Sequence, residues 1–268
     1  MALKNSKTGL CYSDAGTGPA LVFIHGFPLC GAMWNAQVDD LVDAGFRVIV
    51  PNLPGVGSSR SLELPEASMD GYADLLISLA DELGIARLSF VGMSMGGYIL
   101  LNLLRRFPAR VDTACLVTTR AGADDAVTRL KRDSMMEEVR NGRASLVSRT
   151  FGPTLFSARN AKDHAELIRQ LESCLALMSD EGMMDALQAM KNRPDSEPFL
   201  SDISCPCLII AGEEDQIVPL DQTLLLERAV PHNRTCLIAH AGHMANMEQP
   251  AIFNDCLISF LREELVLA

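Results

Sequence analysis

A nucleophilic serine is indicated by the sequence G-M-S-M-G at Gly92–Gly96. The apolar run Leu88–Val91 before it is typical of a buried strand, and Gly97–Leu104 after it predicts a helix. A strand that turns directly into a helix needs glycines beside its central residue, because a side chain there would collide with the neighbouring backbone. We therefore expect Ser94 at the tip of this turn, facing a cleft, with the N–H of Met95 available to bind an oxyanion. A glycine-rich structural turn with a solvated serine is the alternative.

A histidine is the second requirement, because a serine hydroxyl is a weak nucleophile until a base accepts its proton. We assign His243, which follows Ala-Gly in the loop between the last predicted strand and the last predicted helix. A flexible loop can place an imidazole over the serine more easily than a strand end can. His240, three residues earlier, is the main alternative. Solvated, structural or charge-surrounded positions are expected for the other three histidines, which are His232, His25 and His164.

A carboxylate must orient the histidine, and Asp215 is the candidate. It lies in the loop Gly212–Pro219, which follows a predicted strand, and its short side chain suits a fixed hydrogen bond. Glu213 and Glu214 are expected to be solvated loop charges. The remaining alternatives for the acid follow the preceding strand and are Asp124 and Asp125.

Alternating strands and helices must position these groups. Strands are predicted at residues 20–25, 47–51, 88–91, 113–118, 207–211 and 236–239, and helices at 34–44, 68–83, 97–104, 220–229 and 249–264. This alternation predicts an α/β fold with a mostly parallel sheet and helices on both faces. Ligands of such sheets bind at the carboxyl ends of the strands, where the candidate residues fall.

The composition changes between residues 120 and 199. This stretch is rich in charged residues, Met and Ala, and it has helical periodicity without a clear strand. We predict a helical lid of roughly three to five helices at 120–199, with a core domain formed by 1–119 and 200–268. Core filling is expected for most of the lid methionines, and an adaptable apolar pocket is the alternative for them. These methionines are Met135, Met136, Met178, Met183, Met184 and Met190.

Charge and composition exclude several partners. The chain has 268 residues, 48% of them hydrophobic, and a net charge of −11, which disfavours nucleic acid and anionic lipid surfaces. The first ten residues lack the apolar run of a secretory signal, and no run reaches the ~18 apolar residues of a membrane span. The eight cysteines are scattered, mostly within apolar runs, which predicts reduced core residues in a cytoplasmic protein. No Cys/His cluster has zinc-site spacing.

Four motifs together resemble the α/β-hydrolase superfamily in type and order. They are H-G-F-P at 25–28, G-M-S-M-G-G at 92–97, the loop 212–219 and A-G-H at 241–243. The S-M-G-G run and T-R-A-G-A-D at 119–124 look more closely like carboxylesterases related to 3-oxoadipate enol-lactonase, and cofactor-free perhydrolases share much of this pattern. The resemblance implies that Phe27 supplies a second oxyanion N–H beside Met95, and that the insertion at 120–199 is the family's lid.

Two positions depart from or refine the superfamily pattern. Asn52 stands where the family usually has Asp, so this loop can be hydrogen-bonded but carries no charge there. The elbow nucleophile is Ser rather than Asp, which argues against haloalkane dehalogenase and epoxide hydrolase chemistry.

Three residues are expected to bind substrate. Arg120 follows a predicted strand and is able to hold a substrate carboxylate, although an ion pair with Asp124 or another lid acid is the favoured interpretation. Trp34 is assigned to the pocket wall, with core packing as an equal alternative. Met93, within the sequence G-M-S-M-G, is the third expected substrate-binding residue.

These observations predict a serine hydrolase that cleaves an ester or lactone through an acyl-enzyme, without metal or cofactor. The expected partner is a small-molecule ester or lactone, and a homodimer is left open. The alternatives are a perhydrolase or haloperoxidase-like enzyme, a carbon–carbon hydrolase with the same triad, and a ligand-binding receptor on the same fold.

Overall fold

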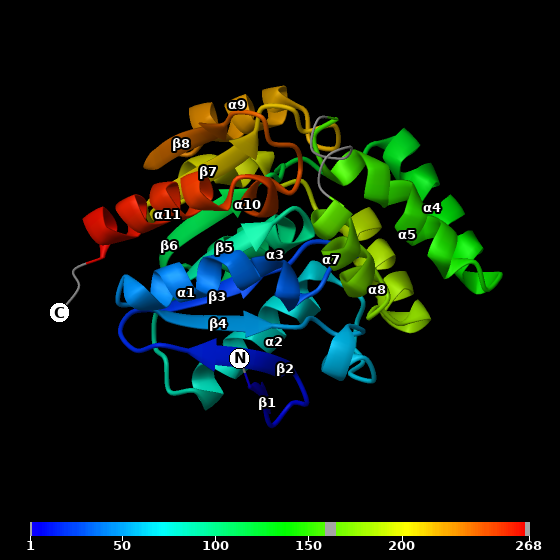
Figure 1. The fold of residues 1–268 in the computed structure, drawn as a ribbon, viewed down its shortest axis with the longest axis horizontal. Coiled ribbons are helices and arrows are strands. Elements are labelled where there is room, and N and C mark those ends of the chain that lie inside the picture. Colours follow the sequence, from blue (N-terminus) through cyan, green and yellow to red (C-terminus); the bar gives the residue numbers. More distant parts are fainter. Residues whose placement is uncertain (1, 159–164, 266–268) are drawn as a thin grey trace.

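A mixed, mostly parallel sheet of eight strands runs through the protein (Figure 1). The computed structural model describes residues 2–158 and 165–265. The strand order is β1-β2-β4-β3-β5-β6-β7-β8, parallel from β4 onwards, with antiparallel pairing of β1 with β2 and of β2 with β4. The strands are β1 Leu3–Asn5, β2 Cys11–Ala15, β3 Ala20–Ile24, β4 Arg47–Pro51, β5 Leu88–Met93, β6 Val111–Val117, β7 Cys207–Gly212 and β8 Asn233–Ile238.

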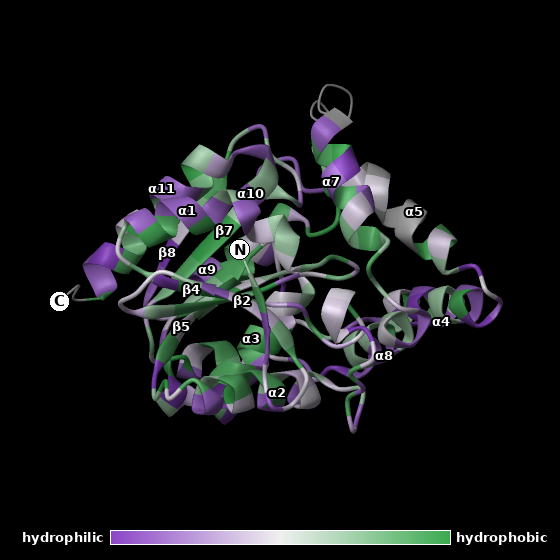
Figure 2. Cartoon of the chain, turned by 60° about the horizontal axis from the view of Figure 1, so that its bottom comes forward, coloured by the Kyte–Doolittle hydropathy of each residue, from purple (hydrophilic) through white to green (hydrophobic). Residues whose placement is uncertain are grey.

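Helices cover both faces of this sheet. On one face α2 and α3 pack together, and on the other α1 packs against α11, so an apolar core lies on each side. In Figure 2 the strands β5 and β7 are coloured mainly as apolar, whereas α1 and α11 mix apolar and polar residues. The helices of this part are α1 Asn35–Asp43, α2 Met69–Glu82, α3 Met95–Arg106, α9 Leu220–Ala229, α10 Ala245–Glu248 and α11 Pro250–Glu264.

The predicted α/β architecture is confirmed, including the six predicted strands. The helix start predicted at Ser68 is also correct. The Ser68 hydroxyl accepts a hydrogen bond from the N–H of Gly71 at 3.1 Å and caps α2. Strands β1 and β2 were not predicted. β1 has only three residues, all exposed, so it lacks an apolar pattern and depends on pairing with β2.

Four described α-helices connect β6 to β7, to one side of the sheet (Figure 1). They are α4 Ala126–Arg140, α5 Ala144–Leu155, α7 Ala165–Leu175 and α8 Asp180–Asn192. They fall within the segment predicted as a lid. The boundaries 1–119, 120–199 and 200–268 and the lid role stay a prediction. Within residues 2–158 and 165–265, no helix has the length and apolar character needed to cross a membrane.

Two disulfide bonds contradict the prediction of reduced cysteines. Cys30 is bonded to Cys174, with 5.3 Å between their Cα atoms, and Cys236 to Cys256, with 6.8 Å. These partners are 144 and 20 residues apart in sequence, so their spacing gave no sign of the pairing. Only folding brings the sulfur atoms together. The free cysteines are all buried and are Cys11, Cys115, Cys205 and Cys207.

Candidate active site

The turn between β5 and α3 holds Ser94 in a strained conformation, with φ 53° and ψ −111°. Its neighbours must be glycines because the backbone passes too close for a side chain. A Cβ on Gly92 would lie 2.4 Å from the carbonyl oxygen of Gly96, and a Cβ on Gly96 would lie 2.3 Å from that of Ile24. The G-x-S-x-G pattern is therefore a direct consequence of this turn.

Hydrogen bonds fix the backbone of Ser94 from both sides. Its N–H donates to the carbonyl of Val117 at 2.9 Å, which ties the turn to β6. Its carbonyl accepts from the Thr119 hydroxyl at 2.8 Å and from the N–H of Gly97. The serine side chain is thereby held at the pocket that its hydroxyl lines.

His243 and Asp215 form a buried pair at the same pocket. The distance from His243 Nδ1 to Asp215 Oδ2 is 2.8 Å, and both side chains are buried. The other carboxylate oxygen of Asp215 accepts from the N–H groups of Ile217 and Val218, at 2.8 and 3.0 Å. Because the carboxylate accepts from Nδ1–H, the Nε2 atom of His243 is left to accept a proton. No hydrogen bond joins this imidazole to Ser94 in the part of the chain that the structure describes; such bonds are often long before substrate binds.

The alternative histidine, His240, lies outside the pocket. It has φ 59°, its side chain is 61% exposed, and its Nδ1 atom is 3.7 Å from a carboxylate oxygen of Glu214. Of the two, only His243 lines the cavity beside Ser94. His164 lies outside the described residues.

His25 has a structural place in the loop after β3, as expected. Its Nδ1–H donates to the carbonyl of Gly26 at 3.0 Å, and its Nε2 accepts from the N–H of Leu53 at 3.0 Å. Burial lowers the pKa of His25 to about 4, against the opposing effect of the bond to Gly26. The ring is therefore neutral at pH 7 and joins two loops.

The oxyanion candidates lie beside the serine. Met95 is the first residue of α3, so its N–H has no acceptor within the helix. Phe27 lines the cavity, and a Cβ on Gly26 would lie 3.3 Å from the Ser94 Cβ, so the loop carrying Phe27 is packed against the turn. Their assignment to an oxyanion hole stays a prediction.

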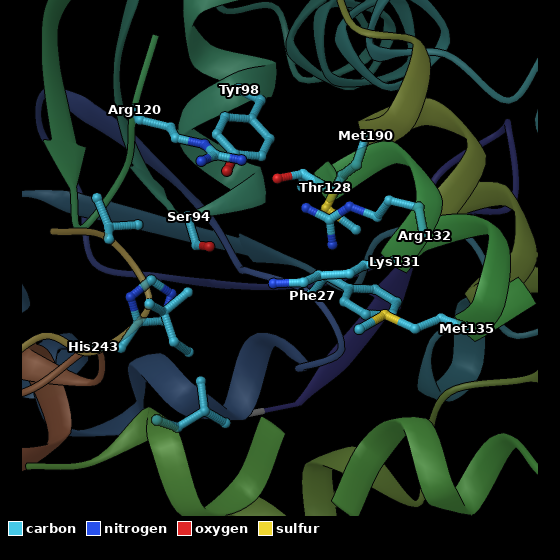
Figure 3. Close-up of a pocket in the computed structure, with 13 residues that line it drawn as sticks. Phe27, Ser94, Tyr98, Arg120, Thr128, Lys131, Arg132, Met135, Met190 and His243 are labelled. Atoms are coloured by element: carbon cyan, nitrogen blue, oxygen red, sulfur yellow. The ribbon is translucent and has the colours of Figure 1, made fainter. Parts of the chain in front are cut away.

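The cavity has a volume of about 240 Å³ and an apolar and a basic part (Figure 3). Its apolar lining comes from Phe27, Met135, Leu155, Met190, Ile217 and Val218. Its polar lining comes from Tyr98, Arg120, Thr128, Lys131 and Arg132, besides Ser94 and His243. Among residues 2–158 and 165–265, no group of three or more His, Cys, Asp or Glu is placed to hold a metal ion.

Two residues predicted to bind substrate do not line the cavity. Trp34 is fully buried in the core, where its ring packs edge-on against Phe23 at 5.1 Å and near Phe253 at 6.0 Å. Met93 is also fully buried, behind Gly26, and does not line the cavity. Both belong to the apolar core on the α1 and α11 side of the sheet, which residue type alone did not reveal.

Arg120 lines the cavity and also forms the ion pair that was favoured for it. Its Nη2 atom donates to Asp124 at 2.8 Å. The Asp124 carboxylate is fully buried and also binds Arg132 and Arg193, at 3.1 and 2.6 Å. Burial opposes its charge, but Arg193 and Arg132 outweigh burial and lower the pKa of Asp124. Asp124 is therefore committed to the arginines and is not the partner of His243.

Sequence reasoning missed four polar side chains of the cavity wall. Tyr98 lies on α3, and the other three lie on α4, together with Met135. Thr128, Lys131, Arg132 and Met135 are spaced i, i+3, i+4 and i+7, which is one face of a helix. That spacing is the sequence signal that would have grouped them.

Smaller expectations about the site are met in part. Asn52 was expected to hydrogen-bond its own loop; instead its Oδ1 accepts from the N–H of Gly31, in the loop after β3, at 2.8 Å. Among the lid methionines, Met136, Met178 and Met183 are buried, as predicted for core filling. Met190 is buried as well, and it lines the cavity together with the half-buried Met135.

Comparison with known proteins gives a consistent picture. The profile of the alpha/beta hydrolase fold family matches residues 19–250. The 2-hydroxy-6-oxononadienedioate/2-hydroxy-6-oxononatrienedioate hydrolase of Burkholderia vietnamiensis (strain G4 / LMG 22486) is 30% identical over 94% of this chain and 90% of its own.

Two solved structures superimpose closely. A thermophilic esterase from Thermogutta terrifontis, with malate bound, has a TM-score of 0.91 and 33% identity, over 95% of this chain and 93% of its own. The enol-lactonase from Burkholderia xenovorans LB400 has a TM-score of 0.85 and 23% identity, over 95% and 97%, and shows the shared fold.

Proposed function

Since the chain belongs to the α/β-hydrolase fold family and is a serine hydrolase of that fold, we propose that it cleaves a carboxylic ester or lactone, with Ser94, His243 and Asp215 as its catalytic residues. The observation that carries the proposal is the buried His243–Asp215 pair at the cavity that Ser94 lines. A strained serine, an imidazole with a free Nε2 and a fixed carboxylate are the parts of an acyl-transfer site.

The reaction follows from these parts. His243 Nε2 takes the Ser94 proton while Oγ bonds to the substrate carbonyl carbon, whose oxygen becomes an oxyanion bound by the N–H groups of Phe27 and Met95. The intermediate collapses, the bond to the leaving oxygen breaks, and His243 gives its proton to the departing alcohol. A water molecule then attacks the acyl-enzyme with His243 as base, which releases the acid and restores Ser94. Asp215 holds the imidazole in the required tautomer throughout.

Active-site labelling and turnover test this proposal together. A fluorophosphonate should label the wild-type protein but not Ser94→Ala, and a panel of p-nitrophenyl esters and small lactones should identify the substrate. Ser94→Ala and His243→Ala should each lower kcat by roughly four to six orders of magnitude. His240→Ala is the matched control and should retain most of the activity. A folded His243→Ala protein with near-normal turnover would refute the assignment.

Carbon–carbon hydrolysis is the second candidate. The relative from Burkholderia vietnamiensis is named for a dioate substrate, and the cavity of this chain has basic residues able to bind carboxylates. The test is the loss of dienol absorbance of a 2-hydroxy-6-oxo-dienedioate, measured beside the ester panel. A kcat/KM for this compound above that for every ester would replace the ester proposal.

A further inference from the structure

The cavity beside Ser94 is positively charged, although the whole chain has a net charge of −11. Arg120, Lys131 and Arg132 line it, and no Asp or Glu is among the described residues that do. Charge of one sign in a partly apolar cavity attracts a ligand of the opposite sign more strongly than the same charge on an open surface, and the exposed Lys131 stands where that cavity meets solvent.

Neighbouring acids do not neutralise this wall. The buried Asp124 carboxylate is shared by Arg120, Arg132 and Arg193, so one negative charge faces three positive charges. Arg193 also lies over the ring of Tyr98, with its guanidinium carbon 4.0 Å from the ring centre. The ion pairs therefore fix the arginines in place and leave an excess of positive charge at the cavity.

Lys131 is the cation that these contacts do not use. Its ammonium group forms no hydrogen bond or ion pair with any residue that the structure describes. Lys131 interacts electrostatically with the Asp125 carboxylate. That carboxylate, however, caps α4 by accepting from the N–H of Thr128 at 2.7 Å. Figure 3 shows the Lys131 side chain reaching from α4 into the cavity toward Ser94.

The positions of Lys131 and His243 indicate which half of a bound ester lies near each of them. In the view of Figure 3 the His243 ring lies to the left of Ser94 and the Lys131 ammonium group to its right, so the two approach the serine from different directions. The leaving alcohol must lie next to His243, because that residue gives it a proton. The acyl chain then extends away from His243, into the cavity that both Lys131 and Arg120 line.

We propose that Lys131 and Arg120 form a carboxylate-binding subsite for the acyl half of the substrate. The preferred substrates are then half-esters or lactones whose acid part ends in a second carboxylate, with an uncharged leaving group. This inference rests on the proposed ester hydrolysis and names its substrate class. Lys131 supplies a point charge, and Arg120 supplies guanidinium N–H donors beside its bond to Asp124.

Three esters of similar size test the inference. Monoethyl glutarate carries a carboxylate where ethyl pentanoate has its terminal methyl group, and the pentanoate ester of 3-hydroxypropanoate carries the charge on its leaving group. We expect kcat/KM for monoethyl glutarate to exceed that for ethyl pentanoate by at least about tenfold. The ester with a charged leaving group should show no such advantage. Equal values for the first two esters, or an advantage only for the third, would overturn the inference.

Variants on one helix assign the effect to Lys131. Lys131→Gln should reduce the glutarate-to-pentanoate ratio of kcat/KM by about ten- to a hundredfold, and Lys131→Arg should retain most of it. Arg129→Gln is the matched control, because Arg129 is exposed on the same helix, does not line the cavity and loses the same charge. If the glutarate-to-pentanoate ratio falls equally in Arg129→Gln and Lys131→Gln, the effect comes from the overall charge of the protein, and the subsite is refuted.

Product binding separates failure of the subsite from failure of the proposed function. If none of the esters is hydrolysed, the ester proposal fails while the subsite is still tested by calorimetry with glutarate and pentanoate. Tighter binding of glutarate to wild-type protein, lost in Lys131→Gln, supports the subsite independently of turnover. Indistinguishable binding of the two acids refutes it.

Discussion

The residues proposed to react are held in place by hydrogen bonds that involve the backbone. The left-handed backbone of Ser94 is retained because its N–H and carbonyl are both hydrogen-bonded and the flanking glycines allow close backbone contact. The same principle applies to Asp215, whose carboxylate is fixed by the two backbone N–H groups of the loop after β7. Backbone hydrogen bonds thus fix both Ser94 and Asp215 in the positions that the proposed reaction needs.

We predict that the stability of the protein depends on pH through His25. Its pKa is about 4 in the folded protein, below the 6.5 of an ordinary histidine. The unfolded chain therefore binds a proton first, and stability present above pH 6.5 is lost as the pH falls toward 4. We expect a loss of about 2 kcal/mol between pH 7.5 and pH 5 from this group.

Urea unfolding of wild type and His25→Gln at these two pH values measures this contribution. The glutamine amide still offers an acceptor to the N–H of Leu53, but it does not titrate. The free energy of unfolding of the variant should fall by about 2 kcal/mol less than that of wild type over this interval. The same fall in both proteins would show that His25 does not carry the effect.

At the scale of elements, the helices between β6 and β7 provide one wall of the cavity, while the proposed triad comes from outside them. α4 contributes Thr128, Lys131, Arg132 and Met135, and Met190 comes from α8. The buried Asp124 joins α4, the loop after β6 and the end of α8 through its three arginines. We propose that the segment 120–199 acts as the lid that selects substrates.

Substitution of the two cavity methionines tests this division of labour. Met135→Ala and Met190→Ala each remove part of the apolar wall and so enlarge the cavity, whose volume is only about 240 Å³. Each variant should therefore raise kcat/KM for longer acyl chains several-fold relative to that for short ones. The rate of labelling by a small fluorophosphonate should change much less, since Ser94 and His243 are untouched.

Met136→Ala is the control, because Met136 is buried in the core beside these residues and does not line the cavity. It should cost stability without changing chain-length preference. If acetyl and octanoyl ester rates move together in all three variants, the lid does not determine substrate size.

For the whole molecule, the Cys30–Cys174 bond joins the loop after β3 to helix α7, across 144 residues of chain. A cross-link that closes a longer loop removes more entropy from the unfolded chain. Loss of this bond should therefore cost about 2 kcal/mol more than loss of Cys236–Cys256, which spans 20 residues.

Paired serine variants measure this difference. The double variants Cys30→Ser/Cys174→Ser and Cys236→Ser/Cys256→Ser are compared with wild type by denaturant unfolding, without reductant. Thiol titration of the denatured wild-type protein should detect four of its eight cysteines before reduction. Eight titratable thiols, or equal stability of all three proteins, would contradict the prediction.

The sequence by itself determined the α/β fold, the six central strands and the candidates Ser94, Asp215 and His243. These features depend on interactions between neighbours in the chain: the alternation of apolar strands and helices, and glycines forced by a turn. The preference for His243 over His240 also came from local sequence, because a loop that follows Ala-Gly has more conformational freedom than a strand end. The catalytic roles of the three residues remain to be tested by the variants above.

Tertiary structure decided which distant side chains meet. It placed Trp34 and Met93 in the core, bonded Cys30 to Cys174, and gathered three arginines around Asp124. It also turned Lys131 into the cavity beside Ser94. Such contacts depend on how elements far apart in the chain pack together. Local spacing can group side chains on one face of a helix, as on α4, but it does not say what that face packs against, because the same side chain is stable in a core, a cavity or an ion pair according to its neighbours.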